Sequence, residues 1–439
     1  MPKCTGSRID FGRLGRRVIE ADFSGGELSS DGGLMLVRQV DQRIGLTRMA
    51  AAKLSDPRDP GRIRHSLRTL LAQRLYGLCC GHEDLNDHAR LREDLVMQTA
   101  VGGDEALASA PTLSRLETRA TRAQAWALHE VLIEQFIASH EGAPTGLVLD
   151  VDASDVPLHG QQESRQFHGY YDHHCYLPLY VFCGQAMLAC YLRRSRIDGA
   201  KNATAVLKLI IRRLRQAWPE VAIIVRGDSG FCRERLMRWC ERHRVGYILG
   251  LARNARLQDQ VWPVEQALAE QYAARGSKQR EIGEFSYAAQ SWAHERRVIT
   301  RLEYGAQGNN PRFVVTNVEG RAEELYDTLY CQRGEAENRI KEVQLDLFGT
   351  RASCHKFLAN QFRLLLAGLA YTLMHRLRAL ALQATELANA SAATIRVRLL
   401  KIGVAMLRNT RRVRLMYASH HPLRELFALA AVRLGAAGP

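Results

Sequence analysis

The feature that most constrains this chain is a change of hydrophobic pattern near residue 141. Before it, apolar residues recur at helical spacing, whereas beyond it they form short runs or alternate with polar residues. The short runs predict strands at residues 147–152, 177–183, 186–192, 221–226 and 246–251. Periodic stretches at 200–218 and 233–243 predict helices. The predicted order is therefore strand, strand, strand, helix, strand, helix, strand.

This order of elements predicts the fold class. Gly184 and Gln185 separate the second and third runs and are typical of a hairpin turn. Three antiparallel strands followed by helix–strand units are the order of a ribonuclease H-like core. We therefore expect an α/β protein with a core of that kind. At 439 residues the chain is too long for one typical domain.

The rest of the chain predicts further regions around this core. Helical patterns at 34–44, 64–78 and 121–140 predict a mostly helical N-terminal region. Residues 278–318 alternate polar and apolar side chains and predict a β-rich insertion, which helices at 323–348 and 358–382 would follow. Residues 395–398 and 412–415 alternate apolar and basic side chains and predict the strands of a basic hairpin. The expected regions are 1–140 (mostly helical, DNA-binding), 141–255 (first part of the core), 256–320 (insertion), 321–390 (the helix with Glu337 and the end of the core) and 391–439 (basic C-terminal region).

Charge and composition limit the kinds of binding partner and the cellular compartment that we expect. The chain has 61 Lys and Arg against 46 Asp and Glu, a formal charge of +15, which favours a polyanion such as nucleic acid. A basic protein without that role remains the alternative. No apolar run reaches the length of a membrane span, and residues 1–17 lack the apolar segment of a signal peptide, so we expect a cytoplasmic protein. The ten cysteines form no zinc-binding spacing and are expected to be free thiols.

Acidic residues stand at the ends of two predicted strands. Asp150 and Asp152 end the run 147–152, and Asp228 follows the run 221–226. Sites in open α/β sheets form just past strand ends, and carboxylates are the protein ligands that Mg²⁺ prefers. The alternative for Asp228 is a turn-forming role, because Ser229 and Gly230 follow it.

The helix expected after the insertion offers a third carboxylate. One helical stripe carries Tyr330, Arg333, Glu337, Lys341 and Gln344, whereas Glu335 points to the opposite side. An arginine beside a metal-binding glutamate suits a phosphate group. A ladder of ion pairs on a solvated face is the alternative for this stripe.

These motifs resemble the catalytic blocks of insertion-sequence DDE transposases, in the class whose ribonuclease H-like core carries a β-strand insertion. The blocks are Asp152-Ala-Ser154, Arg226-Gly-Asp228-Ser-Gly-Phe231 and Tyr330-x2-Arg333-x3-Glu337. The tyrosine-rich stretch 167–182 and the segments 338–342 and 354–360 resemble, more narrowly, the thirteen-eighty group of insertion sequences. The resemblance covers residues 20 to 420.

The resemblance implies a function and a site. Asp152, Asp228 and Glu337 would bind two Mg²⁺ ions, which Mn²⁺ can replace, and the enzyme would cut element ends and join the 3′-hydroxyl to target DNA. Tyr330 and Arg333, with Lys341 as a substitute contact, would bind DNA phosphates. Trp292 would stack on a flipped base, or else belong to the core of the insertion. The partners would be the terminal inverted repeats and target DNA, bound by a homodimer at the nucleoid.

Departures from the pattern leave alternatives open. The class often has a lysine where this chain has Gln344, and the first metal ligand could be Asp150 or Asp155 instead of Asp152. The block with His168, His173, His174 and Cys175 lacks a four-ligand zinc spacing, and its tyrosines suit a strand and loop near DNA better. Other candidates are a DNA-binding protein that has lost catalysis, a nuclease on the same core and a serine hydrolase, which only Gly227-Asp-Ser-Gly230 suggests.

Overall fold

The computed structural model describes residues 8–436 of the chain. Residues 1–7 and 437–439, the outer ends of the predicted N- and C-terminal regions, lie outside the described residues. The chain forms two compact units. One contains residues up to 51, residues 56–116 and residues from 376 onward, and the other contains residues 52–55 and 117–375. Every predicted site residue belongs to the second unit.

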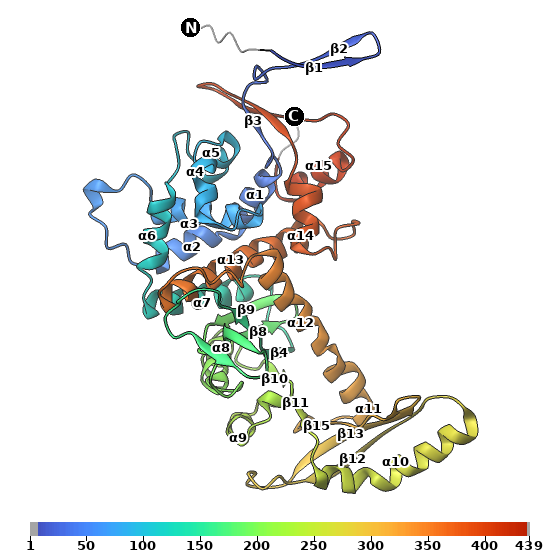
Figure 1. Ribbon diagram of the computed structural model, residues 1–439. Helices are drawn as coiled ribbons and strands as arrows, with labels where there is room; N and C mark the ends of the chain where they lie inside the picture. Colours follow the sequence, from blue (N-terminus) through green and yellow to red (C-terminus); the bar gives the residue numbers. More distant parts are fainter. Residues whose placement is uncertain (1–7, 437–439) are drawn as a thin grey trace. The chain divides into compact units, whose positions relative to one another are not determined.

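The second unit is built on a nine-stranded sheet (Figure 1). The strands run in the order β12-β13-β15-β11-β10-β4-β8-β9, with β14 paired to β13. They are β4 (Gly146–Ala153), β8 (Leu179–Cys183), β9 (Ala186–Tyr191), β10 (Ala222–Gly227), β11 (Gly246–Leu251), β12 (Gln279–Tyr287), β13 (Arg296–Gly305), β14 (Gly308–Asn309) and β15 (Arg312–Thr316). Strands β4, β10 and β11 are parallel, and β8 and β9 continue the sheet antiparallel. This confirms the predicted α/β class.

Alternation along the strands separates the two faces of this sheet. Leu149 and Val151 of β4 belong to the main apolar core. The helices that contribute to this core are α7 (Arg122–Ile137), α8 (Ala203–Ala217), α9 (Glu234–Arg242) and α10 (Ala255–Arg275). On the other face, Ile248, Val314 and Tyr326 form a second, smaller apolar cluster. Asp150 and Asp152 alternate with the core residues and therefore point to this second face.

The insertion region is not a separate β domain. Its strand β15 pairs with β11 of the core, so the insertion strands extend the core sheet. It also contains a 21-residue helix, α10, which the alternating pattern of 278–318 did not indicate. Figure 1 shows α10 lying along β12 and β13. The insertion is thus a sheet extension backed by a helix.

The helix predicted at 323–348 is present, but its turns are irregular. It consists of α11 (Ala322–Glu324), the π-helical η4 (Leu325–Tyr330), the 3-10 turn η5 (Cys331–Arg333), α12 (Gly334–Lys341) and the π-helical η6 (Glu342–Asp346). Wide π turns within a helix recur at functional sites. The next helix, α13 (Phe357–Ala381), is long and apolar enough to span a membrane, yet 89% of its apolar window is buried inside the protein. Helix α13 is therefore buried to the extent expected of a helix in a protein core.

The remaining elements of the second unit are short. They are β5 (Val156–Pro157), β6 (Gln166–His168), β7 (His173–Tyr176) and η3 (Ser229–Phe231). The three strands form a small sheet in the order β5-β7-β6.

The first unit combines helices with two small sheets. Its elements are β1 (Ile9–Leu14), β2 (Arg17–Ala21), β3 (Leu28–Ser29), α1 (Leu34–Ile44), α2 (Leu46–Lys53), η1 (Pro60–Arg62), α3 (Leu67–Cys79), η2 (Leu85–Asp87), α4 (His88–Leu91), α5 (Leu95–Val101), α6 (Ala110–Thr118), α14 (Ala392–Ile395), η7 (Arg396–Leu400), β16 (Val404–Arg408), β17 (Val413–Tyr417) and α15 (Arg424–Arg433). Strands β16 and β17 pair as an antiparallel hairpin.

The predicted strand at 395–398 is wrong. These residues are helical, because Ser391 caps the helix: its hydroxyl accepts a hydrogen bond of 3.3 Å from the backbone N–H of Thr394. Val404 begins the first strand of the hairpin and pairs with Tyr417. The alternation of apolar and basic residues does not follow burial in this helix, because Ile395 is buried whereas Val397 is 69% exposed.

Candidate active site

Two carboxylates meet at the ends of paired parallel strands. Strand β10 pairs with β4 so that Gly227 lies opposite Val151. Asp228, the residue after β10, therefore comes beside Asp152 on the same face of the sheet. The Asp228 carboxylate also caps the turn η3, accepting a hydrogen bond of 2.8 Å from the backbone N–H of Gly230. Asp228 therefore both caps the turn η3 and lies beside Asp152.

One step deeper along the same strands lies a buried ion pair. Arg226 donates a hydrogen bond of 2.8 Å from Nη2 to Oδ2 of Asp150, and its Nη1 donates to the carbonyl of Leu329. Burial raises the pKa of Asp150, although the Arg226 guanidinium opposes this. The Asp150 carboxylate is therefore already paired with Arg226. Through its hydrogen bond to Leu329, Arg226 also links β10 to the helical segment that leads to Tyr330.

Arg333 bridges the first and third predicted acids. Its Nη1 lies 3.3 Å from Oδ2 of Asp152, and its Nη2 lies 2.6 Å from Oε1 of Glu337. Burial raises the pKa of Asp152 to about 6, with the neighbouring Asp228 as the second cause and a smaller contribution from Glu337; Arg333 opposes the shift. The three acids are therefore close enough to influence one another.

The three acids have the ligand chemistry that a hard divalent cation prefers, although their side chains are not arranged around a common metal position. Three carboxylates converge, and the charge of Asp228 already disfavours ionisation of Asp152, a repulsion that a cation relieves. Among residues 8–436, no group of three or more His, Cys, Asp or Glu side chains is arranged as a metal centre. The positively charged guanidinium of Arg333 bridges Asp152 and Glu337.

The glutamate helix brings two more of the predicted residues to the site. Tyr330 reaches strand β11, where a methyl group on Gly250 would lie 2.7 Å from the tyrosine hydroxyl and 2.8 Å from the backbone nitrogen of Ser229. A glycine is therefore needed at position 250 for this approach. Lys341 and Glu335 are exposed on the same helix.

Gln344, at the position where the resembling class often has lysine, is buried and links two segments of the chain. Its Nε2 donates a hydrogen bond of 2.9 Å to the carbonyl of Asp155 and also contacts the hydroxyl of Ser154. It thus fastens the end of the helix to the chain just past β4. The Asp155 carboxylate lies 2.8 Å from Nε2 of His173, so it is paired outside the group of three acids.

A cavity of about 670 Å³ opens beside Asp228, whereas Asp152 and Glu337 do not line it. Asp228, Tyr330 and Arg333 line it from the core, and Arg253, Arg301 and Arg312 line it from the insertion and the loop before it. The sequence reasoning missed the last three arginines. Period-two alternation in 296–316 could have placed Arg301 and Arg312 on strands, but it could not show that those strands join the core sheet.

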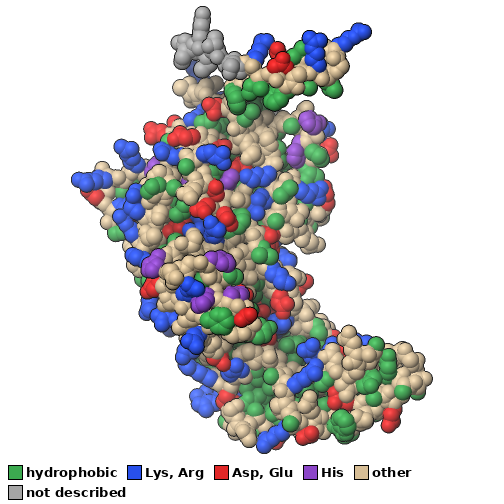
Figure 2. Space-filling model, viewed as in Figure 1, with side chains coloured by type: hydrophobic (Ala, Val, Ile, Leu, Met, Phe, Trp, Pro, Cys, Tyr) green, Lys and Arg blue, Asp and Glu red, His purple; other side chains and the backbone are tan. Residues whose placement is uncertain are grey.

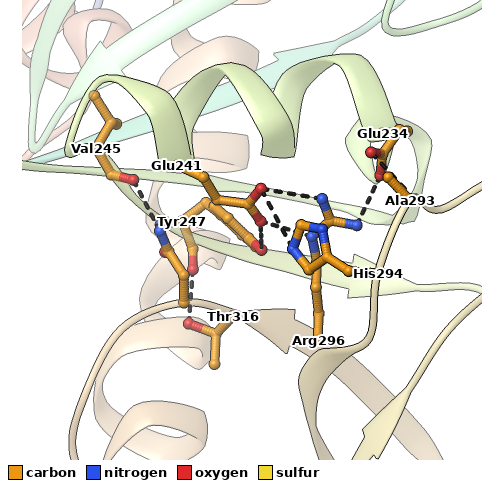
Figure 3. A network of polar contacts seen from close by, with 9 residues as sticks. Glu234, Glu241, Val245, Tyr247, Ala293, His294, Arg296 and Thr316 are labelled. Atoms are coloured by element: carbon orange, nitrogen blue, oxygen red, sulfur yellow. Dashed lines mark hydrogen bonds and ion pairs between the residues drawn. The ribbon is translucent and has the colours of Figure 1, made fainter.

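Trp292 does not line this cavity. Its ring packs edge-on against Tyr287, at 5.6 Å between centroids, and the Arg296 guanidinium lies 5.3 Å from its centroid. Figure 3 shows Arg296 between Glu234 and Glu241, with His294 and Tyr247 beside them. Trp292 is therefore part of the packing that joins the insertion to helix α9.

Comparison with known proteins adds a family match. A family profile described as transposase DDE domain group 1 matches residues 11–439. No curated protein sequence matches the chain. Among solved structures, a cryo-EM structure of a piggyBac transposase synaptic complex with hairpin DNA covers 85% of this chain and 80% of its own, with 11% identity and a TM-score of 0.41.

Proposed function

Because the chain belongs to the transposase DDE domain group 1 family, we propose that it is an active DNA transposase of the thirteen-eighty type, which cuts the ends of an insertion element and joins the 3′-hydroxyl to target DNA. The observation that carries this proposal is the convergence of Asp152, Asp228 and Glu337 around Arg333. The strand order β9-β8-β4-β10-β11, with only β8 antiparallel to both of its neighbours, supports a ribonuclease H-like core.

The three carboxylates would hold two Mg²⁺ ions, or Mn²⁺ in their place. When bound, such ions stabilise charge on the attacking and leaving oxygens of a phosphodiester. Asp152 is preferred over Asp150 as the first ligand, because Asp150 is paired with Arg226. Asp228 is held by its cap to Gly230, so its carboxylate is oriented before DNA binds.

The neighbouring residues would bind and orient DNA. A guanidinium forms paired hydrogen bonds to phosphate as readily as to carboxylate, so Arg333 exchanges a carboxylate partner for a phosphate oxygen near the cut. Tyr330 lies at the edge of the same cavity, and Arg253, Arg301 and Arg312 would receive the adjoining phosphates. Lys341 contributes a further exposed cation on the helix. The packing of Trp292 beneath Arg296 argues against its stacking on a base.

Double-stranded DNA is the proposed partner. The net charge of +15 suits a phosphate backbone, and Figure 2 shows Lys and Arg side chains distributed over much of the visible face. Such a protein would act on the terminal inverted repeats and the target DNA as a homodimer assembled on DNA, in the cytoplasm at the nucleoid.

A cleavage assay tests this function. The substrate is a duplex that carries inverted repeats from the DNA flanking the gene, incubated with Mg²⁺. Wild type is expected to cut at the repeat end, whereas Asp228→Ala and Glu337→Ala bind the duplex without cutting it. Glu335→Ala, on the exposed side of the same helix, is the matched control and should cut normally.

The assay also separates the alternatives. Cutting by the two alanine variants would show that the assignment of the three acids is wrong. Binding by wild type without cutting would favour a DNA-binding protein that has lost catalysis. The serine hydrolase gains no support, because within residues 8–436 no hydrogen bond joins the hydroxyl of Ser229 to a histidine.

A further inference from the structure

An exposed aromatic turn projects from the small sheet β5-β7-β6. Gly169, Tyr170, Tyr171 and Asp172 connect β6 to β7. Tyr170 is 87% exposed and Phe167, on β6, is 46% exposed. Large aromatic side chains exposed together on a turn are unusual unless they contact a partner.

Local contacts support the turn. Asp172 has a left-handed backbone, with φ of 55°, and its N–H donates a hydrogen bond of 2.9 Å to the carbonyl of His168. The half-buried ring of Tyr171 lies 4.9 Å from that of His168 and 5.0 Å from that of Tyr170, between centroids. The exposed ring is therefore supported by its neighbours, and little ordering is needed when it binds a flat partner.

The base of this turn adjoins the candidate active site. His173, the first residue of β7, is paired with Asp155, three residues after Asp152. Burial, and then the charges of Asp155 and Asp152, raise the pKa of Tyr171 to about 12. The turn thus stands within the electrostatic reach of the proposed metal-binding acids.

Exposed cations flank the same small sheet. Ser195 donates a hydrogen bond of 2.9 Å to the carbonyl of Gln166, and the backbone N–H of Arg196 donates to the side chain of Gln166. Arg194 and Arg196, on either side of Ser195, are both exposed. Aromatic rings interleaved with cations are the combination that binds single-stranded nucleic acid by stacking and backbone attraction.

We propose that Tyr170 is the stacking platform for an unpaired base of the DNA next to the cut, with Arg194 and Arg196 holding the adjoining phosphates. The inference rests on the proposed function, and it gives the aromatic turn the role that the sequence resemblance assigned to Trp292. Stacking requires only a ring, so the hydroxyl of Tyr170 should be dispensable, and any base can be the partner.

Binding of full-length protein to two DNA probes tests this. One probe is a blunt duplex, and the other is the same duplex with about six unpaired nucleotides and 2-aminopurine at the junction, a length within the range of single-strand sites. Wild type should quench the 2-aminopurine. Tyr170→Ala should abolish the quenching and weaken binding to the extended probe by roughly tenfold, with the blunt duplex unaffected. Tyr170→Phe should behave as wild type.

Tyr191→Ala is the matched control, because Tyr191 is another exposed tyrosine of the same unit, on β9 and outside the turn. Equal binding and quenching by Tyr170→Ala and wild type would overturn the inference, as would an equal loss in Tyr191→Ala. Failure of wild type to bind either probe would overturn the proposed function and this inference with it. Thermal unfolding of each variant checks that the fold is retained.

Discussion

Arg296 and Arg333 each bridge two carboxylates in the same unit, but the acids around them differ. Arg296 lies between Glu234 and Glu241, with its side chain only 2% exposed (Figure 3). Burial alone would raise the pKa of Glu241, yet hydrogen bonds from Arg296 and Tyr247 outweigh it and lower that pKa. Hydrogen bonds that outweigh the cost of burial are what a structural ion pair requires.

The Arg333 cluster has three carboxylates around its arginine, one more than the Arg296 cluster. Arg333 is 22% exposed and contacts Asp152 and Glu337, while Asp228 adds a third carboxylate. The pKa of Asp152 is raised to about 6, the opposite direction to that of Glu241. The difference teaches that the balance of charge around an arginine distinguishes a structural ion pair from a candidate catalytic site.

The largest expected effect separates chemistry from packing. Asp152→Asn should reduce DNA cleavage by about a thousandfold or more, roughly 4 kcal/mol in the barrier, because a proposed metal ligand is lost. Glu241→Gln should leave the cleavage rate per folded molecule unchanged. Single-turnover cleavage at saturating protein measures both. If Asp152→Asn cut DNA normally, the raised pKa of Asp152 would not indicate a catalytic role. Asp150 would then again be a candidate for the first metal ligand.

The next effect concerns stability. Arg296→Ala leaves two partly buried glutamates without their cation and should lower the free energy of unfolding by about 3 kcal/mol. Arg333→Ala should change it by about 1 kcal/mol or less, because that cluster is more hydrated and its remaining acids can take up protons. Chemical denaturation followed by tryptophan fluorescence measures the two values. Equal losses would mean that both clusters are structural.

The same contrast shows what the sequence could predict. Runs of apolar residues ending in Asp152 and Asp228 placed both acids at strand ends, since strand alternation is a local property. Tyr330 ends η4, Arg333 ends η5 and Glu337 lies in α12. Despite these irregular turns, Arg333 contacts Glu337 and lines the same cavity as Tyr330, as the helical spacing predicted. Local periodicity therefore sufficed for the α/β class and for most of the candidate site.

Pairings between distant segments could not be predicted. Nothing in the pattern around Trp292 shows that Arg296 is matched by two glutamates of α9, more than fifty residues earlier. Residues 395–398 have an alternation that suits a strand, yet the cap from Ser391 and the burial of Ile395 favour a helix. For Arg296 and for residues 395–398, contacts with distant parts of the chain therefore matter more than the local sequence pattern.

A pH series should reveal opposite slopes from the two clusters. The pKa of Asp152 is raised from 3.8 to about 6, so in EDTA its ionisation destabilises the fold progressively as pH rises from 4 to 6. Glu241, whose pKa is lowered from 4.5, stabilises the fold above that pH and loses its contribution as pH falls. Asp152→Asn should therefore be more stable than wild type by about 2 kcal/mol at pH 7 and no more stable at pH 4. A gain of equal size at both pH values would contradict the assigned pKa.

The smallest expected effect is stabilisation by Mg²⁺, and it distinguishes the clusters most directly. A cation that binds only the folded protein stabilises it by about 1.4 kcal/mol at ten times its dissociation constant. Wild type and Glu241→Gln should both show this shift in thermal unfolding, since the acids of the Arg333 cluster are intact in each. Asp152→Asn and Glu337→Gln should lose it, because each removes one of the three converging carboxylates. A shift that persists in both of these variants would place the cation elsewhere, and a shift lost in Glu241→Gln would mean that the Arg296 cluster, with its lowered carboxyl pKa, also binds the ion.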